Sequence, residues 1–207
     1  MKTKLLFLTL LITTGVWAQA PYEKSMNTGM QLWQSGKNVE AIAQFGRITN
    51  VGENDWIPAY YQALVTIVTA FDTSDMDDKN SLIQQATTIL DSHPDQDNNP
   101  EWLVLKALAI TAELTTDPST KGQVLSPKII ALYEKARNLA PHNPRVILGL
   151  SEFQMQSKRY FHEDTSSECE IIKKALHLFD TQRSEVPFAP SWGKERAEQI
   201  ISTCLSQ

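Results

Sequence analysis

Hydrophobic side chains recur at spacings of three and four residues along most of the chain, the period of an amphipathic helix. Met26, Met30 and Trp33, for example, share one side of a helical projection. The expected helices span residues 23–35, 38–50, 58–71, 79–92 and 167–179, and others begin near residues 100, 127, 144 and 191. No segment shows the strict alternation of a half-buried strand. The pattern predicts an all-α protein of roughly nine helices.

Residues that typically begin or end helices support these boundaries. Asn99-Pro100, Ser126-Pro127 and Asn143-Pro144 each combine a capping residue with a proline. Proline is well tolerated in the first turn of a helix, where its missing N–H would have no partner. Gly36 is expected to end the first helix of the mature chain.

Small and large residues in this pattern follow a repeated order. The first pair of helices contains Gly29, Leu32, Gly36, Ala41, Phe45 and Ile48, and a second match contains Tyr133, Ala136, Pro141, Gly149 and Leu150. In this order the chain resembles the tetratricopeptide repeat (TPR), a helix–turn–helix unit of about 34 residues. The resemblance covers about residues 22–179 and implies a solenoid of about four units, closed by a C-terminal capping helix within 187–207.

The match to the repeat is incomplete. Ser25 and Thr28 stand where the family carries large apolar residues, and the later units are stretched. An irregular helical bundle with accidental spacing is the alternative.

The first 18 residues are expected to be a signal peptide. Lys2 and Lys4 precede a short apolar run from Leu5 to Val16, and Ala18 offers a small residue for cleavage. The run is shorter than the roughly 20 residues of a membrane span, although an uncleaved anchor is the alternative. Because no cysteine lies near the expected cleavage site, a lipoprotein is not expected. Residues 19–207 then form the mature repeat domain, periplasmic or secreted, with no second membrane-spanning run.

Export would place the two cysteines, Cys169 and Cys204, in an oxidising compartment. An even cysteine number in an oxidising compartment favours a disulfide, with two buried free thiols as the alternative. The formal charge of −5 and the pI of about 5.4 argue against nucleic acid or anionic lipid as the main partner.

The resemblance implies a concave groove, lined by the first helix of each unit, that accepts extended peptides. Four aromatic residues fall on those helices and are candidate partner-binding residues: Trp33, Tyr60, Tyr61 and Trp102. Ordinary helix–helix packing is the alternative for each of them.

Three longer connections are expected at residues 72–78, 117–125 and 159–166, each between the two helices of a unit. In a solenoid such insertions fall along one edge, which is often a binding edge. Asp75, Asp117 and Asp164 are its candidate residues, and plain surface loops are the alternative.

Sequence motifs for catalysis were not found. P-loop, G-x-G-x-x-G, H-E-x-x-H, C-x-x-C and G-x-S-x-G patterns are absent from the sequence. We therefore assign no catalytic, metal-binding or cofactor-binding residue and expect no cofactor. The leading hypothesis is an exported, non-enzymatic scaffold for a protein or peptide partner. A structural component of an envelope complex is the first alternative, and a hydrolase or metal-dependent enzyme at residues 161–169 is the second. The sequence does not determine the partner's identity or the oligomeric state.

Overall fold

In the computed structural model of the protein, residues 16–48 and 55–204 are described. Over these ranges the chain forms nine α-helices, one short 3-10 turn and no strand, so the predicted all-α class is confirmed. The helices are α1 (Val16–Gln34), α2 (Asn38–Arg47), α3 (Ile57–Asp72), α4 (Met76–Asp91), α5 (Pro100–Leu114), α6 (Pro118–Leu139), α7 (Pro144–Tyr160), α8 (Ser166–Thr181) and α9 (Lys194–Cys204), with the 3-10 turn η1 at Pro94–Gln96.

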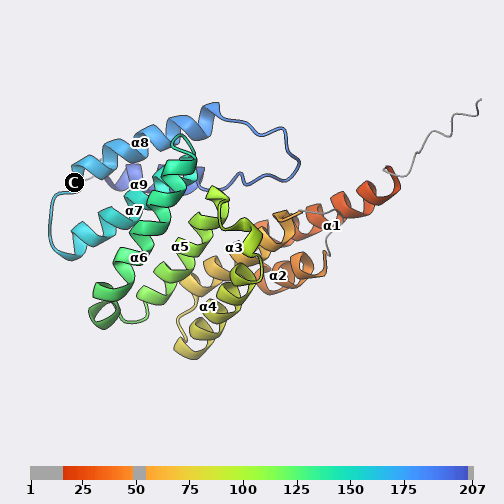
Figure 1. The fold of residues 1–207 in the computed structure, drawn as a ribbon, viewed down its shortest axis with the longest axis horizontal. Helices are drawn as coiled ribbons and strands as arrows, with labels where there is room; N and C mark the ends of the chain where they lie inside the picture. The colour runs from red at the N-terminus through yellow and green to blue at the C-terminus, as the bar shows by residue number, and fades with distance from the viewer. Residues whose placement is uncertain (1–15, 49–54, 205–207) are drawn as a thin grey trace, which may run out of the picture.

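Consecutive helices pack as neighbouring pairs: α1 with α2, α3 with α4, α5 with α6, and α7 with α8 (Figure 1). The first helices of the later pairs also contact each other, since α5 packs against both α3 and α7. Helix α9 packs on α8 at the C-terminal end. This arrangement is the predicted helical-repeat solenoid with a C-terminal capping helix.

Gly36 ends α1, as expected. Its φ of +74° places it in the left-handed region, where glycine has no steric penalty. The Lys37 N–H donates to the Leu32 carbonyl at 2.9 Å, and the Gly36 N–H donates to the Trp33 carbonyl at 2.9 Å. These two bonds form a Schellman motif, which satisfies the last carbonyls of the helix.

Glycines inside two helices allow an aromatic ring of the neighbouring helix to approach closely. A Cβ atom at Gly29 of α1 would lie 2.6 Å from the Phe45 ring of α2. A Cβ atom at Gly149 of α7 would lie 2.5 Å from the Tyr133 ring of α6. The small and large residues that carried the repeat resemblance therefore pack against each other in space.

We predict that Gly29→Ala lowers the free energy of unfolding by about 1–3 kcal/mol. The Phe45 ring is buried and stacks on Tyr61 with centroids 5.5 Å apart, so it has little room to yield to a methyl group. Urea denaturation measures the change. The matched control is Gly122→Ala in α6, where a Cβ atom meets nothing within 4 Å; it is expected to stabilise by about 0.5–1 kcal/mol. A Gly29→Ala protein as stable as the wild type would contradict this packing.

The connections within the pairs are shorter than the sequence suggested. Helix α4 begins at Met76, and α6 begins at Pro118 rather than near Pro127, so most of the expected loops 72–78 and 117–125 is helical. Pro118 occupies the first turn of α6, while Pro127 lies inside that helix. Packing of Leu125 and Ile129, both buried, keeps the helix continuous through a proline that would weaken an isolated helix.

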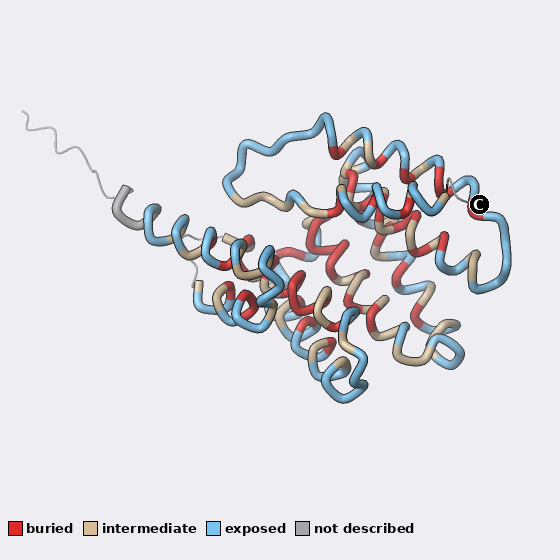
Figure 2. The backbone as a smooth tube through the Cα atoms, turned by 180° about the vertical axis from the view of Figure 1, so that it is seen from behind, coloured by how far each residue is buried: buried red, intermediate tan, exposed pale blue. Residues whose placement is uncertain are grey.

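The core runs through the middle of the solenoid. Figure 2 shows the buried positions concentrated in the inner helices and the exposed positions at the turns. Helices α3 and α5 are buried on nearly every side, with Leu64, Val65, Val104 and Leu105 each fully buried. A helix that is apolar all round is typical of the centre of a layered α-protein.

Most of the predicted signal peptide, residues 1–15, lies outside the described residues, and cleavage after Ala18 stays a prediction. Among the described helices, none combines the length and the apolar character that crossing a bilayer requires.

Candidate functional site

A non-helical segment crosses the first helices of the repeat pairs. We call this segment, residues 182–193, the strap; it connects α8 to α9 (Figure 1). Its first half is exposed and its second half is partly buried (Figure 2). The strap therefore occupies the face on which a peptide groove was expected.

Hydrogen bonds hold the second half of the strap on α3. The Trp192 indole N–H donates to the Tyr60 hydroxyl at 2.8 Å, and the Tyr61 hydroxyl donates to the Ala189 carbonyl at 3.4 Å. Burial, reinforced by the nearby Glu101 carboxylate, raises the pKa of Tyr60 well above its ordinary value. Burial also raises the pKa of Tyr61 to about 12. The Tyr60 hydroxyl thus accepts a bond from the strap, and the Tyr61 hydroxyl donates one to it.

Beneath the strap lies a buried ion pair between α5 and α7. The Arg145 guanidinium donates to Glu101 through two bonds of 2.7 Å, from Nε to Oε2 and from Nη2 to Oε1. Asn143 Nδ2 donates to Glu101 Oε1 at 2.6 Å, and the Tyr60 hydroxyl donates to Oε2 at 3.3 Å. The Glu101 carboxylate is thus fully hydrogen-bonded although only 11% of its side chain is exposed. Such pairing is what allows a charge to be buried.

Two equivalent helix starts place these charges. In α5, Asn99 accepts a bond from the Glu101 N–H at 3.0 Å, with Pro100 between them. In α7, Asn143 accepts a bond from the Arg145 N–H at 2.9 Å, again across a proline. Both starts are evident in the sequence as Asn-Pro pairs, but the ion pair between the charges that follow them was not predicted. The available signal was a charged residue two positions after the asparagine at both Asn-Pro starts, negative in one and positive in the other.

The predicted aromatic residues lie in the core rather than on an open groove. Tyr60, Tyr61 and Trp102 are at most 1% exposed, and only Trp33 is partly exposed. Their rings contact each other: Tyr60 and Tyr61 meet edge to face at 5.5 Å, and Trp33 lies 6.0 Å from Tyr61. For three of the four residues this burial favours the alternative of helix–helix packing, because the neighbouring helices and the strap cover them; a partner-binding role stays a prediction.

Partly exposed rings remain at the edge of this aromatic core. Tyr22 of α1 meets Phe188 of the strap edge to face, with centroids 6.0 Å apart. Phe188 has a φ of +59°, a conformation that costs a non-glycine residue on the order of 1 kcal/mol. Burial, assisted by Asp55, raises the pKa of Tyr22 well above its ordinary value. Tyr22, Phe188, Trp33 and Trp192 are partly buried and pack against the same core cluster, and we call them the aromatic edge.

The three candidate aspartates lie at the expected connections and form local bonds there. Asp75 accepts from the Asp77 and Asp78 N–H groups at 3.0 Å, so it caps α4. Asp117 caps α6 through the Thr120 N–H at 3.2 Å, and Asp164 accepts from the Ser166 hydroxyl at 2.7 Å. Hydrogen bonds from neighbouring hydroxyls lower the pKa of both Asp117 and Asp164. These contacts give each carboxylate a role in local structure, and a shared binding role stays a prediction.

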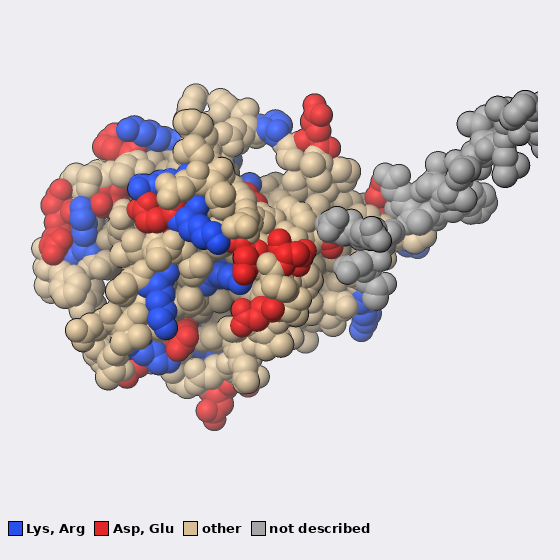
Figure 3. All heavy atoms as spheres, in the orientation of Figure 1, with Lys and Arg blue, Asp and Glu red and all other residues tan. Residues whose placement is uncertain are grey.

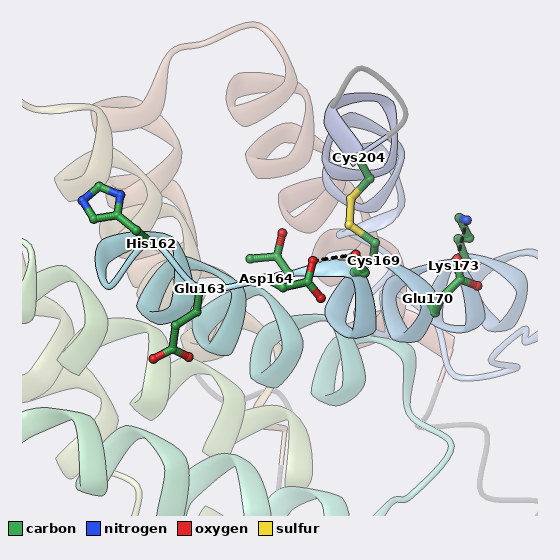
Figure 4. Close-up of a pocket in the computed structure, with 9 residues that line it drawn as sticks. His162, Glu163, Asp164, Cys169, Glu170, Lys173 and Cys204 are labelled. Carbon is green, nitrogen blue, oxygen red and sulfur yellow. Dashed lines mark hydrogen bonds and ion pairs between the residues drawn. A yellow bond between two sulfur atoms is a disulfide. The ribbon is translucent and has the colours of Figure 1, made fainter.

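A polar depression of about 540 Å³ lies beside the α7–α8 loop. Its labelled side chains stand in a row along the rim, with His162 at one end and Lys173 at the other (Figure 4). The expected Cys169–Cys204 disulfide is present at its centre and joins α8 to α9. Among the described residues, no three His, Cys, Asp or Glu side chains gather as a metal site would require.

Charges of both signs are interspersed on the face of the molecule drawn in Figure 3. Lysine and arginine side chains there stand beside aspartates and glutamates and do not form a continuous basic surface. Nucleic-acid binding needs such a surface.

Comparison with known proteins gave one match of fold. Neither the scan of protein-family models nor the search of curated proteins found a match, so the TPR resemblance has no support from a family model. Among solved structures, the HusA haemophore from Porphyromonas gingivalis superposes with a TM-score of 0.75 at 20% identity. The match covers 93% of this chain and 95% of that protein. The two chains share a fold over nearly their whole length.

Proposed function

We propose that this protein is an exported, non-enzymatic binding protein whose ligand docks at the aromatic edge. The observation that carries the proposal is the contact between Tyr22 and Phe188, a partly exposed pair of rings at the outer end of the strap. Phe188 is held there in an unfavourable backbone conformation. Strain of this kind is concentrated at ligand-binding positions.

The ligand we propose is a flat, largely apolar molecule of the tetrapyrrole class. Aromatic side chains bind such molecules by stacking and edge contacts over a large area. The shared fold with a protein described as a haemophore supports this class. Burial raises the pKa of Tyr22 above its ordinary value, so losing the hydroxyl proton, as coordination to iron requires, is less favourable than for an ordinary tyrosine. We therefore propose that ring contacts, rather than coordination of the iron, hold the ligand.

The strap makes an extended peptide a weaker candidate for the same face. A peptide in the groove would have to displace the strap and break the Trp192–Tyr60 hydrogen bond. A flat ligand at the aromatic edge leaves that bond in place. Export is supported by the signal-like start of the sequence and by the disulfide, which is typical of proteins outside the cytosol.

The test is a titration of residues 19–207 with haemin and, separately, with metal-free protoporphyrin IX, followed by absorbance and tryptophan fluorescence. We expect saturable one-to-one binding of both, with affinities that agree within about threefold. Phe188→Ala is expected to weaken both by about tenfold, the equivalent of about 1.4 kcal/mol. The matched control is Phe161→Ala, an exposed ring on the α7–α8 loop.

Two results would count against the proposal. If neither porphyrin binds, the ligand class is wrong. If haemin binds and the metal-free porphyrin does not, coordination of the iron dominates and the site lies elsewhere.

A further inference from the structure

A second aromatic pair lies on the surface of the protein, where α7 ends and the α7–α8 loop begins. Tyr160 and Phe161 are 61% and 64% exposed, and their rings meet edge to face at 5.2 Å. Exposed aromatic side chains that cluster in pairs are typical of protein interfaces, where they act as anchors.

The backbone presents this pair rigidly. The Glu163 N–H donates to the Lys158 carbonyl at 2.8 Å, and the His162 N–H donates to the Arg159 carbonyl at 3.1 Å. This is the same Schellman motif that ends α1, but His162, with a φ of +59°, stands where Gly36 stands there. The loop therefore accepts a strained residue where glycine would be more stable, which is expected where a side chain has a function.

Side-chain contacts fix both ends of the loop. Lys158 at the end of α7 pairs with Glu168 of α8 at 2.8 Å, and the disulfide anchors the same end of α8 to α9. Little conformational entropy would be lost when a partner binds such a preformed loop.

Glu163 and Asp164 follow the aromatic pair in the loop, and Lys158 and Arg159 precede it. Within the described parts of the chain, Glu163 and Asp164 form no ion pair with a lysine or arginine, and both line the polar depression of Figure 4. A partner that covers Tyr160 and Phe161 would bring its own side chains beside these carboxylates. Lysine or arginine would complement them, whereas acidic residues would be repelled.

We propose that residues 160–164 form a docking surface for a protein partner that presents a basic segment beside an apolar pocket. The surface is distinct from the aromatic edge, and the inference does not depend on the proposed ligand.

Site-specific photo-crosslinking in the cell that naturally produces the protein tests this inference. The probe is p-benzoylphenylalanine in place of Phe161, and the matched control carries the same probe in place of Phe71, an exposed aromatic residue at the end of α3. We expect a discrete adduct from position 161 only, and mass spectrometry should place the cross-link in a partner segment rich in lysine or arginine. Adding Glu163→Lys should reduce the adduct yield on the order of tenfold, whereas Glu163→Gln should reduce it less.

The possible failures are distinct. No adduct at position 161, an equal adduct at position 71, an adduct between two copies of this chain, or a yield that Glu163→Lys leaves unchanged would each overturn the inference. The porphyrin titration, in contrast, should be the same for the wild type and Glu163→Lys, so failure of one proposal does not affect the other.

Discussion

Replacing Arg145 with methionine is expected to lower the free energy of unfolding by about 3–5 kcal/mol. The substitution leaves the Glu101 carboxylate buried without its cation, while Asn143 and Tyr60 supply only neutral donors. Removing one partner of a buried pair is costly because the remaining charge stays out of water without an opposite charge to compensate it. Urea denaturation followed by circular dichroism measures the loss.

Two variants make this prediction specific. Arg196→Met breaks an ion pair with Glu152 in which the arginine side chain is 51% exposed, and it should cost less than about 1 kcal/mol. Glu101→Gln combined with Arg145→Met removes both charges and should recover part of the loss. An Arg145→Met protein no less stable than Arg196→Met would show that the pair is not buried in solution.

This network joins parts of the chain that are far apart in sequence. Tyr60 and Glu101 are separated by 41 residues, Glu101 and Arg145 by 44, and Tyr60 and Trp192 by 132. Three helices and the strap are thereby fixed in one arrangement. We infer that the network sets the position of the strap, and with it the position of Phe188 at the aromatic edge.

Local signals predicted the helices well. Apolar spacing and capping residues together located the helices of the described residues, and Gly36, Asn99 and Asn143 end or begin helices as expected. Pro127 misled the prediction, because a proline in the first turn of a helix and one in its interior look alike in sequence. Only the packing of Ile129 distinguishes them.

The candidate site was less predictable, for a physical reason. A repeat pattern describes how each pair of helices packs with its neighbours, but it carries no information about a non-repetitive segment that returns across them. Tyr60 and Tyr61 were therefore expected on an open groove, although the strap covers them. The strap has no periodicity of its own, so its position depends on contacts of long sequence separation.

The disulfide gives the second large expected effect. Replacing Cys169 and Cys204 together by serine should lower the free energy of unfolding by about 3–4 kcal/mol, since the bond closes a loop of 35 residues in the unfolded chain. In the folded protein the bond ties α9, with Ala197 and Ile200 buried, to α8. The strap connects the other ends of these two helices, so the bond closes a loop made of α8, the strap and α9. Urea denaturation of the double variant measures the loss.

Reduction of the wild type provides the matched control, because it breaks the bond without changing a residue. Dithiothreitol should lower the stability of the wild type by a similar amount and leave the double variant unchanged. Denatured, unreduced wild type should show no reactive thiol. Two reactive thiols in protein isolated from its natural compartment would contradict the bond, and with it the strongest structural support for export.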